Sequence, residues 1–383
     1  MTPAELGAEF IHGRAPQTTA LIRDAGLVVV DTGGESWTFD RGALAREATE
    51  FASAAALFEG ALSLPRDRSV DDFLRQFEIA GETAQRALAA RAFVEGFDAA
   101  DPAIASVRAI AQEWRAGADA TSARPVGGYG SLLDYMRAAL TAKGVRISLG
   151  TVVRRISWRR GSVVIEATAS GTDAQTISAR AALITLPAGV LRGTGSAAVT
   201  FDPDLPAEKR EALQRIEMGH VVKVVLSFKT AFWERLGGGR FRDAGFFHSA
   251  AAPIPTYWTL VPLRSELVSA WAGGPKAIAL AALPPHERIE RALTGFAALF
   301  GAHEIARAEF ERALTHDWSA DPFSRGAYSY AAVGGENSRG MLARPVERTL
   351  FFAGEATSTT GQGGTVNGAL ETGARAAAEL LDG

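Results

Sequence analysis

Lys223 is the residue whose surroundings most strongly suggest chemistry. It lies within "HVVKVVLSF", residues 220–228, where its neighbours are apolar and mostly β-branched, so a strand is predicted. A lysine on an edge strand can extend its amine into water. A lysine directed into a cleft can instead hold a water molecule or take part in proton and charge chemistry. The strand pattern alone leaves both interpretations open.

A second stretch gathers aromatic side chains around a turn. "DWSADPFSRGAYSY", residues 317–330, contains Trp318, Phe323, Tyr328 and Tyr330 together with a proline and a glycine. Such a group forms either a packed core cluster or a flat wall against the ring of a ligand.

The C-terminal stretch joins an apolar strand to a helix through a run rich in glycine. The glycines are Gly354, Gly361, Gly363, Gly364 and Gly368. A flexible surface loop is one interpretation, and close approach of the backbone to a bound group is the other. The helix is predicted to start near Thr365, and its positive end would suit an electron-rich carbonyl or a phosphate.

These residues must be positioned by a mixture of helices and strands. Helical patterns cover residues 16–26, 40–115 and 284–301. Strand patterns cover residues 27–32, 145–150, 152–158, 163–169, 181–191, 220–228 and 349–354. Ser69 with Asp72 resembles a helix cap. This alternation predicts an α/β or mixed α+β fold.

Composition excludes several classes of function. The chain has 383 residues, a net charge of −3 and no cysteine, so disulfides, thiolate catalysis and nucleic-acid binding by a basic surface are not expected. The six histidines have no metal-ligand spacing, and we expect no metal. No apolar run approaches the roughly 18 residues that span a bilayer, and no signal peptide is recognisable. We expect a cytoplasmic protein without membrane contact.

Seven stretches taken together resemble the FAD-dependent amine oxidase family, which includes monoamine oxidases, polyamine oxidases and lysine-specific histone demethylases. They are "ELGAEFIHG", "RPVGGYGSLLDYM", "VVRRISW", "ALITLPAGVL", "RIEMGHVVKVVLSFKTAFW", "WSADPFSRGAYSY" and "LFFAGEATSTTGQGGTVNGALETGARAA". They run through nearly the whole chain, and the last three in combination are specific to the family.

The resemblance implies FAD as the cofactor and assigns roles to individual residues. Lys223 would face the flavin, and Tyr328 would line the substrate cavity. The residues implied to contact FAD are Gly7, Ala8, Glu9 and Phe10 beside the ring, Val152 or Val153 at the adenine end, Trp318 near the flavin, Gly354 and Glu355 at the ribityl and diphosphate part, and Gly364, Thr365 and Val366 at the start of the last helix.

The resemblance also implies a two-domain flavin amine oxidase architecture. Residues 1–34, 124–192 and 340–383 would form a discontinuous, Rossmann-like FAD-binding domain. Residues 35–123 and 193–339 would form an α+β substrate-binding domain with a helical roof. The implied reaction is oxidation of a small-molecule amine to an imine with oxygen as acceptor, giving an aldehyde or ketone, ammonia or an amine, and hydrogen peroxide.

Two departures from the family pattern shape these expectations. The sequence contains no G-x-G-x-x-G, the turn that opens the family's first βαβ unit. We therefore expect an incomplete FAD-binding domain. Either the chain is truncated, or a second polypeptide supplies the missing βαβ unit. The alternative is a cofactor-free protein that acts as a fragment or scaffold. In addition, monoamine oxidases place two aromatic rings face to face in the substrate cavity. Tyr328 fills one of these positions, but the other corresponds to Gly363, Gly364 or Thr365, none of which is aromatic. We therefore expect a wider mouth of the cavity.

Overall fold

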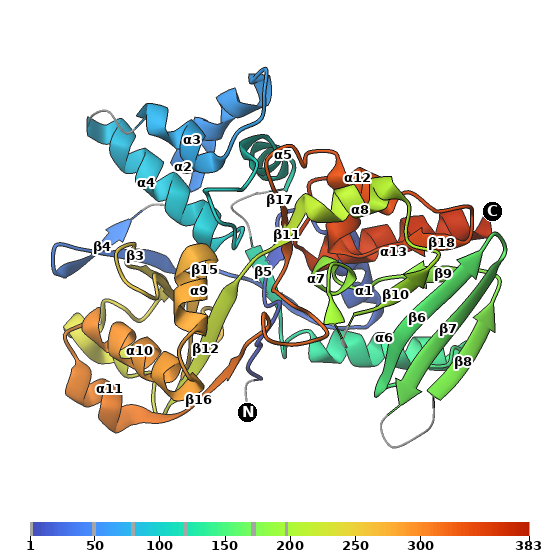
Figure 1. Cartoon of the computed structure of the whole chain (residues 1–383). Helices are drawn as coiled ribbons and strands as arrows, with labels where there is room; N and C mark the ends of the chain where they lie inside the picture. Colours follow the sequence, from blue (N-terminus) through green and yellow to red (C-terminus); the bar gives the residue numbers. More distant parts are fainter. Residues whose placement is uncertain are drawn as a thin grey trace.

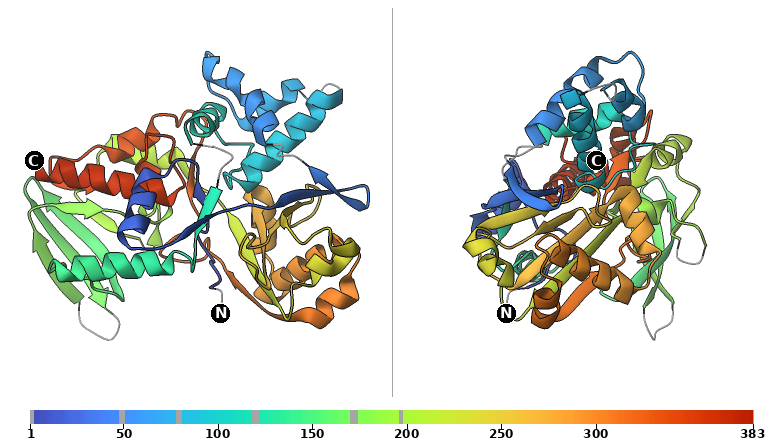
Figure 2. Two further views of the ribbon diagram at one scale, coloured as in Figure 1. Left: turned by 180° about the vertical axis from the view of Figure 1, so that it is seen from behind. Right: turned by 90° about the vertical axis from the view of Figure 1, so that its left-hand side faces the viewer.

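The computed structural model describes residues 3–47, 51–77, 81–117, 122–169, 174–195 and 198–382. Two β-rich parts lie at opposite ends of the molecule (Figure 1 and Figure 2). One is built on a seven-stranded sheet and the other on a four-stranded sheet next to the C-terminal helix. The helices of residues 51–117 lie together above the seven-stranded sheet in Figure 1.

Strand β12, Val221–Phe228, lies inside the seven-stranded sheet and not at its edge. Its neighbours are β15, Leu267–Gly273, and β16, Phe310–His316, and both pairings are antiparallel. Alternate residues Val222, Val224 and Leu226 pack into the core with helix α10, Pro285–Ala298, and with its neighbours α9, Gly274–Ala281, and α11, His303–Glu309. Because side chains alternate along a strand, Lys223 and Val225 point to the opposite face.

The far edge of this sheet corrects one prediction. Residues 40–47, predicted as the start of a helical region, belong to a hairpin of β3, Glu35–Asp40, and β4, Ala43–Glu47. Arg41 and Gly42 have φ angles of 48° and 84°, the conformation that a tight two-residue hairpin turn needs. β3 joins the sheet through β13, Ala244–His248, which pairs with β14, Thr256–Trp258.

The predicted helical layer follows this hairpin. Its elements are α2 Phe51–Phe58, η1 Glu59–Ser63, α3 Val70–Leu74, η2 Arg75–Phe77, α4 Gly81–Gly96 and α5 Val107–Gly117. The Ser69 hydroxyl accepts a hydrogen bond from the Asp72 N–H at 3.1 Å, which confirms the predicted cap. The α5 face formed by Val107, Ile110 and Trp114 is buried, but Ile104 precedes the helix and is 43% exposed.

The four-stranded sheet has the order β10-β6-β7-β8. Its strands are β6 Thr151–Arg159, β7 Ser162–Ala169, β8 Ala174–Ala179 and β10 Thr200–Asp202. The strand predicted at residues 145–150 is wrong, because these residues follow helix α6, Gly130–Ala142, in an irregular segment. Val145, Ile147 and Leu149 are exposed there, so no neighbouring surface buries the alternating side chains that a strand would need.

Short elements connect the two β-rich parts. β9, Ala182–Ile184, pairs in parallel with β18, Leu350–Phe352, and β11, Ile216–Met218, pairs with β17, Ser329–Ala331. A three-stranded sheet joins β1, Ile11–His12, to β5, Ser122–Pro125, and β2, Val29–Asp31. The remaining elements are α1 Pro16–Asp24, α7 Ala188–Leu191, α8 Ala207–Gln214, η4 Phe232–Gly239, α12 Ser338–Ala343, η5 Glu355–Thr357 and α13 Val366–Leu381. The mixed α+β class is confirmed, while the two domain boundaries stay a prediction.

Candidate active site

Lys223 is buried and ion-paired. Its side chain is 2% exposed, and its Nζ lies 2.7 Å from Oε2 of Glu9. The same amine donates a longer hydrogen bond to the carbonyl oxygen of Gly7 at 3.4 Å. The edge-strand interpretation is therefore excluded, and the interpretation of a lysine directed into the interior is the one the structure supports.

The Glu9 carboxylate contacts two cations, Lys223 and Arg124, and the indole of Trp258. Oε1 lies 3.1 Å from Nη1 of Arg124 in β5, and Nε1 of Trp258 in β14 donates to both carboxylate oxygens at 3.1 Å. Burial lowers the pKa of Arg124, and the charge of Glu9 opposes that shift. The sequence predicted Glu9 only as a residue beside a flavin, so its role as the shared anion of a buried cluster is new.

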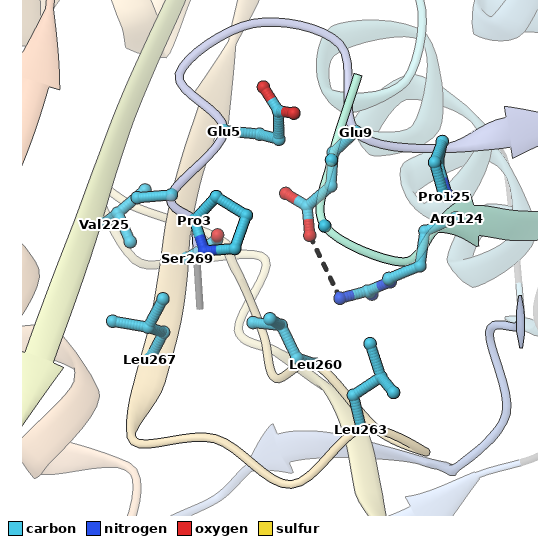
Figure 3. Close-up of a pocket in the computed structure, with 13 residues that line it drawn as sticks. Pro3, Glu5, Glu9, Arg124, Pro125, Val225, Leu260, Leu263, Leu267 and Ser269 are labelled. Carbon is cyan, nitrogen blue, oxygen red and sulfur yellow. Dashed lines mark ion pairs between the residues drawn. The ribbon is translucent and has the colours of Figure 1, made fainter. Parts of the chain in front are cut away.

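A small cavity of about 30 Å³ lies beside this cluster. Figure 3 shows Glu5, Glu9 and Arg124 along one side of it and Leu260, Leu263 and Leu267 along the other. Lys223 is not among the lining residues. Glu9 therefore stands between the buried amine and the cavity.

Trp318 packs on the same short segment that contacts Lys223. Its Nε1 donates to the carbonyl oxygen of Leu6 at 2.9 Å. A Cβ added at Gly7 would lie 3.8 Å from its ring, which is ordinary contact. Gly7 and Ala8 are exposed, and the Phe10 ring lies 5.5 Å from the Trp258 ring, centroid to centroid. The segment predicted to pass beside the flavin thus lies between Trp318 and the Lys223 cluster.

Tyr328 lies directly against the glycine-rich stretch. A Cβ at Gly364, whose φ is 71°, would come within 3.1 Å of Cδ2 of Tyr328. The Tyr328 hydroxyl donates to the carbonyl oxygen of Phe97 at 2.6 Å, and burial, followed by the charges of Asp98 and Glu355, raises the pKa of that hydroxyl. Tyr328 and Gly364 are therefore close neighbours, while their predicted position on opposite sides of a substrate cavity stays a prediction.

Glu355 holds three segments together. Its carboxylate accepts hydrogen bonds from the N–H of Ser329 at 3.1 Å, the hydroxyl of Ser329 at 2.8 Å and the N–H of Gly364 at 2.8 Å. It also lies 3.6 Å from Nη1 of Arg339. Whatever part Glu355 takes in binding a cofactor, its carboxylate fixes the glycine-rich loop against β17.

Arg339 and two further carboxylates, none of them predicted, complete this region. Arg339 is 8% exposed at its side chain and lies 3.1 Å from Glu113 of α5. Burial, and then the charge of Glu355, raises the pKa of Glu113, although Arg339 opposes the shift. Burial, and then the charge of Glu113, raises the pKa of Asp98 well above its usual range. The surroundings of Tyr328 are therefore rich in buried acidic groups.

The start of α13 is capped and docked by side chains. The Thr365 hydroxyl accepts from the Gly368 N–H at 3.0 Å, which places the helix start where the sequence predicts it. Val366 packs beside α1, and Oδ1 of Asn367 accepts from the N–H groups of Gln17 and Thr18 at 3.0 and 3.2 Å. α13 therefore anchors the N-terminus of α1.

A second cavity, of about 230 Å³, opens at the carboxyl ends of β9 and β18. Thr185, Leu186, Gly354 and Glu355 are among its lining residues. Gly354 has a φ of 121°, and a Cβ there would meet only the carbonyl oxygen of Thr185, at 4.0 Å. Ligands of α/β sheets bind at this end of parallel strands. Gly354 and Glu355, which the resemblance assigns to the ribityl and diphosphate part of FAD, both line this cavity, and their role in binding the cofactor stays a prediction.

Two predicted residues lie apart from this assembly. Val152 and Val153 are in β6 of the four-stranded sheet, and neither lines the two cavities described above. Within the described residues, no cluster of three or more potential metal ligands occurs, and no helix is long and apolar enough to cross a membrane.

His12 is a further residue that the sequence did not single out. Its ring contacts the rings of Phe10 and Phe97, at centroid distances of 5.7 and 5.1 Å. Burial lowers the pKa of His12 to about 4. An available signal was its position in "EFIHG", directly after the segment predicted to approach the flavin.

Known proteins match this chain in sequence and in fold. The family described as flavin containing amine oxidoreductase matches residues 2–381. The lysine-specific histone demethylase 1 homolog 1 of Oryza sativa subsp. japonica is 32% identical over 245 residues, 63% of this chain and 27% of that protein. Polyamine oxidase 1 of the same plant is 32% identical over 294 residues, 67% of this chain and 56% of that protein. The chain thus spans between about a quarter and a half of these two relatives.

Solved structures share the fold at low sequence identity. Putrescine oxidase bound to putrescine superposes with a TM-score of 0.79 at 19% identity, and cyclohexylamine oxidase from Brevibacterium oxydans IH-35A with 0.78 at 20%. Each comparison covers 99% of this chain and 88% of the other. The resemblance in the sequence is confirmed, and with it FAD as the cofactor. The chain belongs to the flavin-containing amine oxidoreductase family.

Proposed function

We propose that this protein oxidises an amine to an imine, with molecular oxygen as the final acceptor. Water then converts the imine to an aldehyde or ketone and ammonia or an amine, and oxygen is reduced to hydrogen peroxide. The observation that carries the proposal is the meeting of Lys223 and Trp318 on one segment, Leu6–Glu9, although these residues are far apart in the sequence. FAD, when bound, supplies the two-electron acceptor for the C–H bond next to the nitrogen.

The chain's own residues would bind and orient the reactants. Tyr328 offers a flat ring beside the glycine-rich loop, and the carboxylate of Glu355 lies close enough that, after burial, its charge helps to raise the pKa of the Tyr328 hydroxyl. A negative potential suits an amine, which is cationic in water. Lys223 would place a positive charge beside the segment of Gly7 and stabilise the negative charge that develops when oxygen is reduced.

The remaining contacts to FAD are part of this proposal. The groups assigned to it are Gly7, Ala8, Glu9, Phe10, Val152, Val153, Trp318, Gly354, Glu355, Gly364, Thr365 and Val366. Polyamine oxidase 1 and the putrescine-bound oxidase favour alkyl amines, including diamines, as the first substrates to examine.

The test has two stages. The purified chain is mixed with FAD, desalted and examined for flavin absorbance. It is then assayed for hydrogen peroxide with putrescine, spermidine, benzylamine and cyclohexylamine. We expect flavin to be retained and at least one amine to be oxidised. A colourless protein that releases no peroxide would refute the proposal for the chain by itself, and it would fit either an incomplete FAD-binding domain or a cofactor-free scaffold.

The role of Lys223 is tested in the same assay. Lys223→Met should slow amine oxidation or the reaction of the reduced enzyme with oxygen by at least about tenfold. Lys276→Met is a matched control, because Lys276 also pairs with a carboxylate, Glu95, but lies on α9. Unchanged rates in both half-reactions for Lys223→Met would refute the role.

A further inference from the structure

The Lys223 cluster contains more buried positive charge than negative charge. Lys223 and Arg124 are 2% and 5% exposed at their side chains, and both pair with Glu9. Among the described residues, neither Lys223 nor Arg124 forms an ion pair with a carboxylate other than Glu9. One carboxylate therefore compensates two cations.

We propose that Glu9 is the positioning residue that keeps Lys223 protonated in the folded protein. Its Oε2 accepts a hydrogen bond from the Lys223 amine at 2.7 Å, and the Trp258 indole donates to the carboxylate at 3.1 Å and fixes its orientation. Arginine does not lose its proton in proteins. If Glu9 loses its charge, relief of the buried positive charge must therefore come from Lys223.

The other charged groups near Lys223 do not replace Glu9. Glu5 lines the same cavity, but its Oε1 accepts the Tyr129 N–H at 2.6 Å. His316 on β16 is the register partner of Lys223, and its Nε2 lies 3.0 Å from Asp321. The residue paired with Lys223 on β15 is Trp271, which carries no charge. The protonation of Lys223 thus depends on Glu9.

The first test needs no cofactor and follows unfolding in urea between pH 6 and 9. In Glu9→Gln, the folded state carries a neutral lysine while the unfolded chain still carries an ammonium. The unfolded state of this variant then binds one more proton than its folded state, so the free energy of unfolding must rise with pH. The equilibrium constant for unfolding should therefore fall by up to about tenfold per pH unit relative to the wild type. The wild type, in which the Glu9 carboxylate pairs with the amine, is the reference for this slope.

Two variants make this test specific. Glu9→Gln/Lys223→Met should lose the added slope, because the titrating amine is gone. Glu5→Gln removes a carboxylate from the same cavity and should leave the slope as in the wild type. A Glu9→Gln variant with the wild-type pH dependence would overturn the proposal. If Glu9→Gln does not fold, the comparison is made in the Arg124→Met background, which removes the second cation that Glu9 compensates. There Glu9→Gln should show the added slope and Glu9→Gln/Lys223→Met should not, and absence of the slope in Glu9→Gln/Arg124→Met would contradict the proposal.

The second test rests on the proposed function and is read separately. The FAD-loaded protein is reduced with dithionite, without any amine, and mixed with oxygen. Glu9→Gln should react about tenfold more slowly than the wild type at pH 8 and recover as the pH falls, whereas Lys223→Met should stay slow at every pH. If the urea slope appears but the oxygen reaction is unchanged, Glu9 controls Lys223 while the proposed role of Lys223 in oxygen reduction fails.

Discussion

His12 should make this protein sensitive to mild acid. In the folded state burial lowers the pKa of its imidazole from 6.5 to about 4. Between pH 6.5 and pH 4, His12 binds a proton in the unfolded chain but stays neutral in the folded chain. The stability associated with the neutral ring is therefore complete above pH 6.5 and is lost as the pH falls towards 4. A shift of this size corresponds to about 3 kcal/mol at pH 4.

The test replaces His12 with phenylalanine. Phenylalanine suits the aromatic neighbours Phe10 and Phe97 and cannot titrate. Urea unfolding of the wild type and of His12→Phe is measured at pH 7, 6, 5 and 4. We expect the variant to lose less stability than the wild type by about 3 kcal/mol over this range. His286→Phe serves as control because His286 is exposed. If His12→Phe keeps the full acid dependence, the argument from burial is refuted.

Two further predictions concern the region around Tyr328. Arg339→Met should lower the free energy of unfolding by about 3–5 kcal/mol, because it leaves buried Glu113 without its cation. Urea unfolding measures this loss, and a change below about 1 kcal/mol would contradict the reasoning. Gly368→Ala should prevent correct formation of the start of α13, because its Cβ would lie 2.0 Å from the carbonyl oxygen of Gln362. Gly373→Ala in the same helix meets nothing within 4 Å and should stabilise by about 0.5–1 kcal/mol. Thermal unfolding compares the two, and equal melting temperatures would refute the distinction.

Local patterns predicted the elements that carry the site. The strand of Lys223, the helix start at Thr365 and the cap at Ser69 follow from side-chain alternation and capping chemistry, which depend on near neighbours in the sequence. Residues 40–47 form a hairpin although their composition favours a helix, because the two-residue turn at Arg41 and Gly42 and the pairing of β3 with β4 outweigh local helix propensity. The strand expected at residues 145–150 failed because propensity cannot supply a neighbouring sheet.

The site itself was predicted only in part. Lys223, Trp318 and Tyr328 stood out because each is an unusual residue in its own stretch. Glu9 pairs with Lys223, and Arg339 pairs with Glu113, in each case across more than two hundred residues. Patterns within a single sequence do not report such pairs. Arg124 carries no such signal, because its short strand β5 has the sequence Ser-Ala-Arg-Pro and is not an apolar run.

The separation of these partners has a consequence for how the protein folds. The contact between Arg339 and Glu113 spans 226 residues, that between Tyr328 and Phe97 spans 231, and that between Lys223 and Glu9 spans 214. Contacts of such long range are slow to form, because a long loop must close before they stabilise anything. During synthesis the N-terminal segments emerge before the C-terminal residues that they contact have been synthesised. Glu9, Phe97 and Glu113 are therefore exposed on the growing chain, and the site is assembled last.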